Sequence, residues 1–138
     1  YYDNKIRSSS LKYLNLKSLL KKCNIIIICI PLNRENSNFI NKSRIKTIKD
    51  GSIIINTSRA GVIDENYIIN QAKNKKIFYS SDVFSEEFSK NYFKKIKKLN
   101  TYPNIIITKH IGGLTHESID KTDNFIFSVF LQMISDIK

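Results

Sequence analysis

The sequence predicts an α/β fold organised around a mostly parallel sheet. Short apolar runs rich in β-branched Ile alternate along the 138 residues with segments whose apolar residues recur at helical spacing. The runs are apolar on both faces, which is typical of parallel strands covered by helices on each side. No internal repeat or linker divides the chain, so we expect one domain of ordinary size.

Four of the apolar runs predict strands. The first is the longest and consists almost entirely of Ile, which favours extended structure because its branched Cβ packs well on a pleated surface. The third has the weakest pattern of the four. The predicted strands are Asn24–Ile30, Ser52–Ile55, Ile77–Ser81 and Ile105–Ile107.

Amphipathic segments before, between and after these runs predict the helices. The pair Asp50-Gly51 is a turn signal that closes the second helix, and Asp64-Glu65 opens the third. Thr115 is a candidate N-cap for a longer final helix that carries several Phe residues. The predicted helices are Leu16–Lys22, Lys42–Ile48, Asn66–Lys75 and the segment that follows Thr115.

The formal net charge of +11, from 23 Lys and Arg against 12 Asp and Glu, raises the question of a nucleic-acid partner. Arg, the side chain best suited to bidentate contacts with phosphate and guanine, occurs only four times. The lysines are spread over the predicted helices, and the one dense run is Lys94–Lys98. We interpret the charge as solvated helix faces and expect no nucleic-acid partner.

Hydropathy and cysteine usage exclude further classes. No apolar run approaches the ~18 residues that a membrane span needs, so no membrane partner is expected. Cys23 and Cys29 form neither a CxxC motif nor part of a ligand cluster, so we expect no disulfide framework and no metal site. These features fit a reducing compartment and predict a cytoplasmic protein.

Ligands of parallel α/β sheets bind in the loops that follow the carboxyl ends of the strands. Three such loops contain ionisable side chains: Arg59, the pair Glu86 and Glu87, and His110. A His beside a carboxylate suits acid/base chemistry at neutral pH, and a guanidinium holds a carboxylate by two parallel hydrogen bonds. Together they suit a small 2-keto or 2-hydroxy acid. Each signal alone is weak, because a single His or Arg after a strand is more often a surface or structural residue.

Three blocks of the sequence, by their order and spacing, resemble the signatures of the D-isomer-specific 2-hydroxyacid dehydrogenases in their NAD-binding domain. The resemblance implies a partial Rossmann-like, doubly wound parallel sheet with helices on both faces. It also implies that residues 1–138 are the C-terminal part of that domain. The blocks are Ile54–Glu65, Asp82–Glu87 and Thr108–Gly113, with Leu19–Asn24 and Pro31–Asn33 as supporting matches.

The resemblance implies catalytic roles for three residues. Arg59 is similar to the family's arginine that holds the substrate carboxylate and polarises the C2 carbonyl. His110 is similar to its proton donor and acceptor. Glu87 is similar to the glutamate that pairs with this histidine, and the neighbouring Glu86 stays an alternative because counting along the motif can be off by one.

The resemblance also implies NAD as the cofactor. Asp82 is similar to the residue that contacts the nicotinamide carboxamide. Asp3 resembles the acidic residue that binds the adenosine ribose, which favours NAD over NADP. The other positions expected to line the cofactor are Pro31, Thr57, Ser58, Arg59, His110, Gly112 and Gly113.

One family feature has no counterpart in these residues. The dinucleotide fingerprint GxGxxG lies about 20 residues before the ribose-binding acid, but only two residues precede Asp3. None of the four glycines forms that fingerprint. We therefore expect the glycine-rich phosphate loop and the separate substrate domain to be absent from this chain. In isolation, we expect weak or no NAD binding and no turnover.

Substrate and assembly are less defined by the resemblance. The stretch Gly112–Ser118 is slightly closer to the 3-phosphoglycerate dehydrogenase branch than to the lactate, glycerate and other branches. The family implies a homodimer in the intact enzyme. A non-catalytic relative, acting as an NAD sensor or in the manner of a corepressor, stays open as the alternative function.

Overall fold

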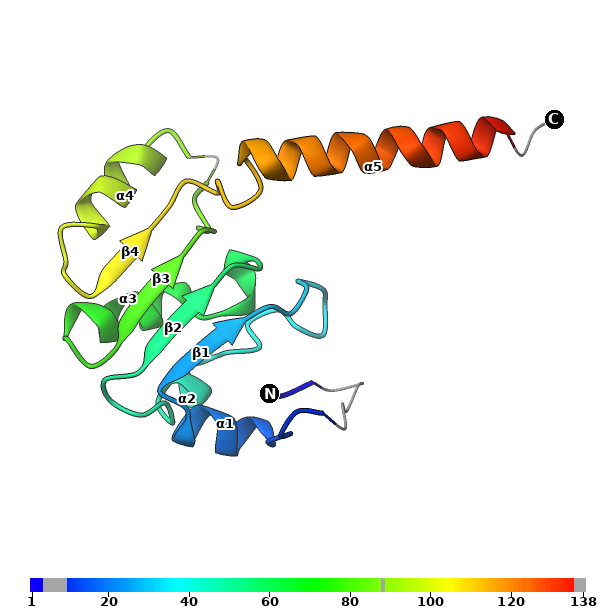
Figure 1. Cartoon of the computed structure of the whole chain (residues 1–138). Helices are drawn as coiled ribbons and strands as arrows, with labels where there is room; N and C mark the ends of the chain where they lie inside the picture. The colour runs from blue at the N-terminus through cyan, green and yellow to red at the C-terminus, as the bar shows by residue number, and fades with distance from the viewer. Residues whose placement is uncertain (4–9, 88, 136–138) are drawn as a thin grey trace.

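The computed structural model describes residues 1–3, 10–87 and 89–135, which are organised around one four-stranded sheet (Figure 1). The strands lie side by side in sequence order, and every neighbouring pair is parallel. The predicted α/β class and parallel sheet are therefore confirmed. The strands are β1 (Ile25–Ile28), β2 (Ile53–Asn56), β3 (Phe78–Ser81) and β4 (Ile105–Ile107).

The register of the strands brings their carboxyl ends to one edge of the sheet. Ile28 pairs with Asn56, Asn56 pairs with Ser81, and Ser81 pairs with Ile107. The loops that follow these four residues consequently leave the sheet at the same edge. We call this edge the carboxyl edge.

Most of the helices begin after a residue whose polar side chain caps the first turn. Such caps are favourable because the first turn leaves backbone N–H groups without a partner inside the helix. The Asn15 side chain accepts a hydrogen bond from the Ser18 amide, and Asp64 accepts one from the Tyr67 amide. Thr115 caps the last helix as predicted, through its hydroxyl and the Ser118 amide. The helices are α1 (Leu16–Lys22), α2 (Lys42–Ile45), α3 (Glu65–Lys73), α4 (Tyr92–Leu99) and α5 (His116–Ser135), and a 3₁₀ turn, η1, spans Ala60–Val62.

Helix α4 was not predicted from the sequence, where its lysines stood out only as a charged run. Tyr92, Ile96 and Leu99 are buried, at the spacing that places them on one helix face. The lysines between them occupy the opposite, more exposed face. A helix with one apolar stripe and a lysine-rich face therefore explains most of the dense charge in this part of the chain.

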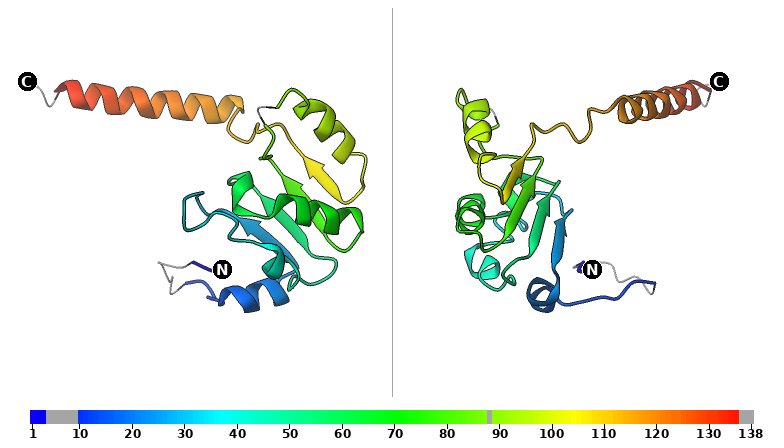
Figure 2. Two further views of the ribbon diagram at one scale, coloured as in Figure 1. Left: turned by 180° about the vertical axis from the view of Figure 1, so that it is seen from behind. Right: turned by 60° about the vertical axis from the view of Figure 1, so that its left-hand side comes forward.

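The core lies between one face of the sheet and the helices α2, α3 and α4 (Figure 2). Alternate strand residues point into it, so that Ile26, Ile54, Tyr79 and Ile105 form one buried row. Helix α1 contributes Leu20, which is 1% exposed. These contacts make the helix-covered face the apolar centre of the molecule.

The other face of the sheet has no helix over it in the described part of the chain, which corrects the expectation of helices on both faces. We call it the open face. When successive parallel strands are added in one direction, right-handed crossovers place all their helices on the same side. Helices on both sides require a reversal of strand order, and the order β1-β2-β3-β4 contains none. The exposed apolar residues of the open face are Ile25, Ile27, Ile53, Phe78 and Ile106.

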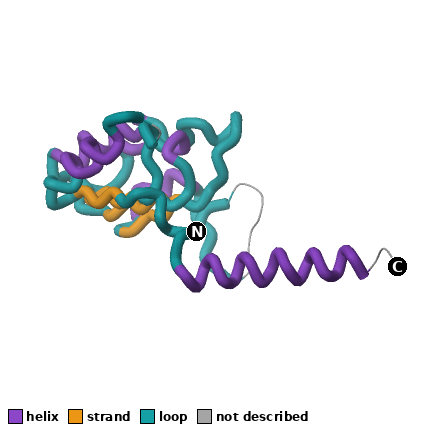
Figure 3. Tube along the Cα trace, turned by 90° about the horizontal axis from the view of Figure 1, so that it is seen from above, coloured by secondary structure: helices purple, strands orange, loops and turns teal. Residues whose placement is uncertain are grey.

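Helix α5 extends away from the sheet as a separate rod (Figures 1 and 3). Its described side chains are exposed, apart from the half-buried Ser118. Within the described ranges, no helix combines the length and apolar character needed to cross a membrane. The large apolar residues exposed on α5 are Ile119, Phe125, Ile126, Phe127, Val129, Phe130 and Leu131.

Candidate active site

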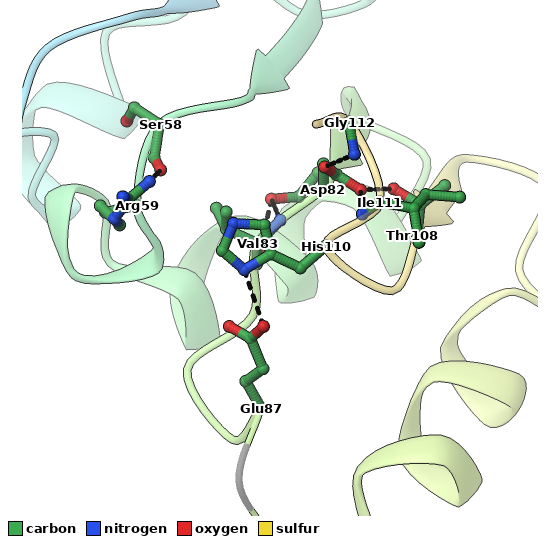
Figure 4. A network of polar contacts seen from close by, with 10 residues as sticks. Ser58, Arg59, Asp82, Val83, Glu87, Thr108, His110, Ile111 and Gly112 are labelled. Atoms are coloured by element: carbon green, nitrogen blue, oxygen red, sulfur yellow. Dashed lines mark hydrogen bonds and ion pairs between the residues drawn. The ribbon is translucent and has the colours of Figure 1, made fainter. Parts of the chain in front are cut away.

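Three loops at the carboxyl edge carry the side chains that the sequence singled out (Figure 4). The loops are neighbours in space because β2, β3 and β4 are adjacent in the sheet. Ser58 and Arg59 lie in the loop after β2, Asp82 and Glu87 in the loop after β3, and His110 in the loop after β4.

His110 and Glu87 are in direct contact. The His110 Nδ1 lies 2.7 Å from the Glu87 Oε1, and the two side chains are 39% and 27% exposed. An imidazole whose Nδ1–H is donated to a carboxylate is fixed in orientation and tautomer, and its Nε2 is left to exchange a proton with a ligand. The pair is thus partly buried, and both side chains remain partly exposed to solvent.

The neighbouring carboxylate, Glu86, has a different partner. It forms an ion pair with Lys95 of α4. Glu86 and Glu87 therefore point to different elements although they are adjacent in the chain. Of the two candidates that the sequence left open, the structure places Glu87 beside His110.

Asp82 holds the loop that carries His110. Its Oδ1 accepts hydrogen bonds from the Thr108 hydroxyl and from the Ile111 amide at 2.9 Å, and its Oδ2 accepts one from the Gly112 amide at 2.7 Å. Partial burial by itself raises the pKa of the Asp82 carboxyl. The three hydrogen bonds and the nearby His110 outweigh that cost and lower the pKa below its ordinary value of 3.8.

Asn56, the last residue of β2, shapes the loop that carries Arg59. It is fully buried, and its Oδ1 accepts hydrogen bonds from the amide and the hydroxyl of Ser58, both at 3.1 Å. Its Nδ2 donates to the Arg59 carbonyl at 3.1 Å. The sequence placed Asn56 inside a family motif without assigning it this function.

The Arg59 side chain is exposed and lies apart from His110 (Figure 4). Its Nη1 donates to the Ser58 carbonyl at 2.7 Å. Arg59 and His110, both of them described, share no hydrogen bond or ion pair. The carboxyl edge therefore joins His110 to Glu87 directly and presents Arg59 separately on the same rim.

Glu65, in the first turn of α3, is a buried carboxylate that contacts the loop after β3. It is 8% exposed, and its Oε2 accepts hydrogen bonds from the Ser85 amide at 3.1 Å and from the Ser85 hydroxyl. Burial raises the pKa of Glu65 above 4.5, against the effect of these bonds. Sequence reasoning missed this contact, because a Glu in the first turn of a helix is usually an exposed residue that favours the helix dipole.

Two open pockets lie along the carboxyl edge. One, of about 430 Å³, contains most of the predicted cofactor positions, including Thr57, His110 and both glycines of the loop after β4. The other, of about 490 Å³, contains Pro31, Ser58 and Arg59. The first is lined by two threonines, Asp82, a histidine and two residues without side chains.

Asp3 lies elsewhere. Together with Tyr1 and Tyr2 it lines a groove of about 450 Å³ that runs beside β1. Among the described residues, no group of three His, Cys, Asp or Glu side chains is placed to hold a metal ion. The ionisable groups that the structure places at the carboxyl edge thus include a histidine paired with Glu87 and the exposed guanidinium of Arg59.

Comparison with known proteins confirms the family that the sequence resembles. Residues 1–112 match the model of a family described as "D-isomer specific 2-hydroxyacid dehydrogenase, NAD binding domain". A hydroxypyruvate reductase from Thermotoga maritima is 33% identical over 108 residues, which are 78% of this chain and 35% of that protein. A D-3-phosphoglycerate dehydrogenase from Haemophilus influenzae is 32% identical over 122 residues, 86% of this chain and 30% of that protein.

The fold is shared with solved structures of D-2-hydroxyacid dehydrogenases. The crystal structure of a D-lactate dehydrogenase from Aquifex aeolicus, complexed with NAD and lactic acid, superposes with a TM-score of 0.83 at 28% identity. That match covers 98% of this chain and 45% of the other. The 138 residues therefore span less than half the length of these three proteins.

Proposed function

Because the chain belongs to the D-isomer specific 2-hydroxyacid dehydrogenases, as part of their NAD-binding domain, we propose that it serves the NAD-dependent interconversion of a 2-hydroxy acid and a 2-keto acid. The contact of 2.7 Å between His110 and Glu87 carries this proposal. A histidine oriented in this way at the edge of an open pocket is suited to exchange a proton with a bound substrate.

In the direction of reduction, the Nε2 of His110 donates a proton to the C2 oxygen of the keto acid. Glu87 stays hydrogen-bonded to the Nδ1 and stabilises the ring before and after the transfer. The hydride that C2 accepts would come from NADH when that cofactor is bound. In the reverse direction His110 takes the proton from the hydroxyl group.

Arg59 holds the substrate carboxylate in this proposal. Its exposed guanidinium has five N–H donors, and the bond to the Ser58 carbonyl occupies one of them. The remaining donors are enough for the two parallel hydrogen bonds that a carboxylate accepts.

We propose that the 430 Å³ pocket takes the nicotinamide end of the cofactor. Thr57, Asp82, Gly112 and Gly113 line it there, together with His110, and Pro31 and Ser58 extend the site along the same edge. Asp3 is proposed to bind the adenosine ribose. Two hydroxyls of an unmodified ribose suit a carboxylate, which favours NAD over NADP.

We propose that residues 1–138 are the C-terminal part of a larger NAD-binding domain, which holds the phosphate loop outside these residues. The outermost strand supports this proposal. β1 has the composition of a central strand, yet it lies at the edge of the sheet, with Ile25 57% and Ile27 60% exposed. Edge strands normally carry charges or other protection against pairing. A further strand beside β1 and helices over the open face would bury these side chains. Without the phosphate loop, residues 1–138 alone are expected to turn over no substrate.

Substrate, assembly and location belong to the same proposal. The relatives include a hydroxypyruvate reductase and a D-3-phosphoglycerate dehydrogenase, so 3-phosphoglycerate is one candidate among small 2-hydroxy acids. The exposed apolar residues of α5 support a homodimer in the intact enzyme. The free cysteines Cys23 and Cys29 support a cytoplasmic location.

The decisive experiment is a hydride-transfer assay on the full-length protein, followed through the nicotinamide absorbance with pyruvate, glyoxylate, hydroxypyruvate and 3-phosphohydroxypyruvate. We expect turnover with at least one of them. His110→Gln should lower kcat by about 10²–10⁴-fold, the usual contribution of general acid catalysis, with little change in NAD affinity. NAD binding without turnover on any keto acid would favour the sensing or corepressor-like relative instead.

A further inference from the structure

The backbone at His110 has a conformation that is uncommon for a residue with a side chain. Its φ is +57°, in the left-handed region, where a Cβ crowds the backbone. This conformation turns the imidazole out of the line of β4 and toward the loop that carries Glu87 (Figure 4). Contacts elsewhere in the molecule have to hold such a backbone in place.

The Asp82 carboxylate supplies these contacts on both sides of His110. The Thr108 hydroxyl, two residues before the histidine, donates to Oδ1. The amides of Ile111 and Gly112, one and two residues after it, donate to Oδ1 at 2.9 Å and to Oδ2 at 2.7 Å. Three donors from one short loop therefore converge on a single carboxylate, with His110 between them.

Asp82 is itself anchored to the sheet. Its amide donates to the Asn56 carbonyl at 3.1 Å, and the Thr108 amide donates to the Ser81 carbonyl at 3.0 Å. Both bonds continue the ladder beyond the ends of β2, β3 and β4. The carboxylate thus connects the loop of His110 to the rigid part of the fold.

The close approach of the Asp82 carboxylate to the loop requires a glycine at position 112. A Cβ on Gly112 would lie 2.8 Å from the Asp82 Oδ2, closer than real Cβ atoms approach an oxygen. A Cβ on the adjacent Gly113 would meet no atom within 4 Å. Only the first of the two glycines is required by the contact with Asp82.

We propose that Asp82 is a positioning residue that holds His110 in its left-handed backbone conformation, and so keeps the imidazole on Glu87. The importance of the His110 position for catalysis rests on the proposed function, but the hydrogen bonds from this loop to Asp82 do not. Both oxygens of the Asp82 carboxylate already accept hydrogen bonds from the loop of His110. Asp82 therefore holds this loop whether or not it also contacts a cofactor.

The test uses NMR of the uniformly ¹⁵N-labelled 138-residue chain and its variants, without cofactor or substrate. In the unaltered chain, the Gly112 and Ile111 amide shifts should follow the ionisation of Asp82, whose pKa is lowered from 3.8 by its hydrogen bonds to this loop. The ring ¹⁵N shifts should report a His110 that donates its Nδ1–H. In Asp82→Asn and in Gly112→Ala, we expect these amides to exchange at least about tenfold faster, as expected for losing a hydrogen bond to a charged group. The His110 ring shifts should move to those of a solvated histidine.

Gly113→Ala is the matched control and should leave the amide and ring signals unchanged. If Asp82→Asn does not fold, Gly112→Ala and Thr108→Val, which removes one donor, decide the question by the same two signals. The proposal is wrong if the ring shifts of His110 are the same in the folded Asp82 or Gly112 variant as in the unaltered chain. Failure of the full-length protein to transfer hydride would count against the proposed function and would leave this result as it stands.

Discussion

At the carboxyl edge of the sheet, the polar side chains are matched with partners inside the chain, whereas the apolar side chains of the open face and of α5 are exposed. Asn56, Asp82 and Glu87 each bind a different loop or side chain of the candidate site. On the open face, by contrast, Ile27 and Ile106 are each 60% exposed. The groups of the candidate site are thus held by contacts within the chain. The apolar surfaces, by contrast, have the composition of surfaces that pack against something further.

The comparison can be tested most strongly within a single strand. Ile26 and Ile27 are neighbours in β1, and their side chains are 6% and 60% exposed. We expect Ile26→Ala to lower the free energy of unfolding by about 2–5 kcal/mol, because it leaves a cavity in the core. Ile27→Ala should cost less than about 1 kcal/mol, because its side chain is mostly in water. Urea unfolding of the two variants gives both numbers, and equal losses would show that the open face is covered in the chain itself.

A smaller loss is expected from the buried amide at the carboxyl edge. Asn56→Ala removes three hydrogen bonds and leaves the Arg59 carbonyl without its side-chain donor. We expect a loss of about 1–3 kcal/mol in the free energy of unfolding. Asn66→Ala, at an exposed position of α3, is the matched control and should be close to neutral. A neutral Asn56→Ala would mean that the loop of Arg59 is held by other contacts.

Glu65 allows a test by pH. Its pKa is raised by burial, so the folded chain keeps a proton on Glu65 at pH values where the unfolded chain has lost it. The free energy of unfolding therefore decreases as the pH rises from 4.5 through the raised pKa, and this contribution is constant above it. Glu65→Gln cannot titrate but still accepts a hydrogen bond from Ser85, so the decrease should disappear.

The measurement for Glu65 is the difference in unfolding free energy between Glu65→Gln and the unaltered chain, followed from acid to neutral pH. Glu35→Gln, on an exposed loop, controls for the removal of one negative charge. A difference that stays the same at every pH would contradict the burial of an ionisable group at position 65.

The smallest effect is expected on α5. Phe125 and Phe127 are 68% and 61% exposed, so replacing both with Ala removes almost no packing. The free energy of unfolding should change by less than about 0.5 kcal/mol, measured in the same urea series. A loss above that would place α5 against the body of the chain. Sedimentation of the same variant tests whether these residues support self-association.

Much of the fold could be predicted because its signals are local. The runs of β-branched Ile in β1 and β4 favour strands strongly. Asn15 and Asp64 mark the starts of α1 and α3, because their side chains accept hydrogen bonds from backbone amides of the first turn. Helix α4 was missed although Tyr92, Ile96 and Leu99 follow the helical period, because the lysines between them dominated the pattern. Helices cover only one face of the sheet because of the order of the strands, and strand order cannot be predicted from a local sequence pattern.

For the candidate site, the sequence by itself determined which chemical groups are present and which loops carry them: Arg59, the two adjacent glutamates and His110 each follow a strand. Counting along the motif favoured Glu87 as the partner of the histidine and left Glu86 open. The tertiary structure decided between them, since the two adjacent residues point to different elements. It alone also decided that Glu65 is buried and that Asp82 joins two loops. Hydrogen bonds between residues 20 to 30 positions apart depend on how the strands are arranged in space, and residue order along the chain does not carry that information.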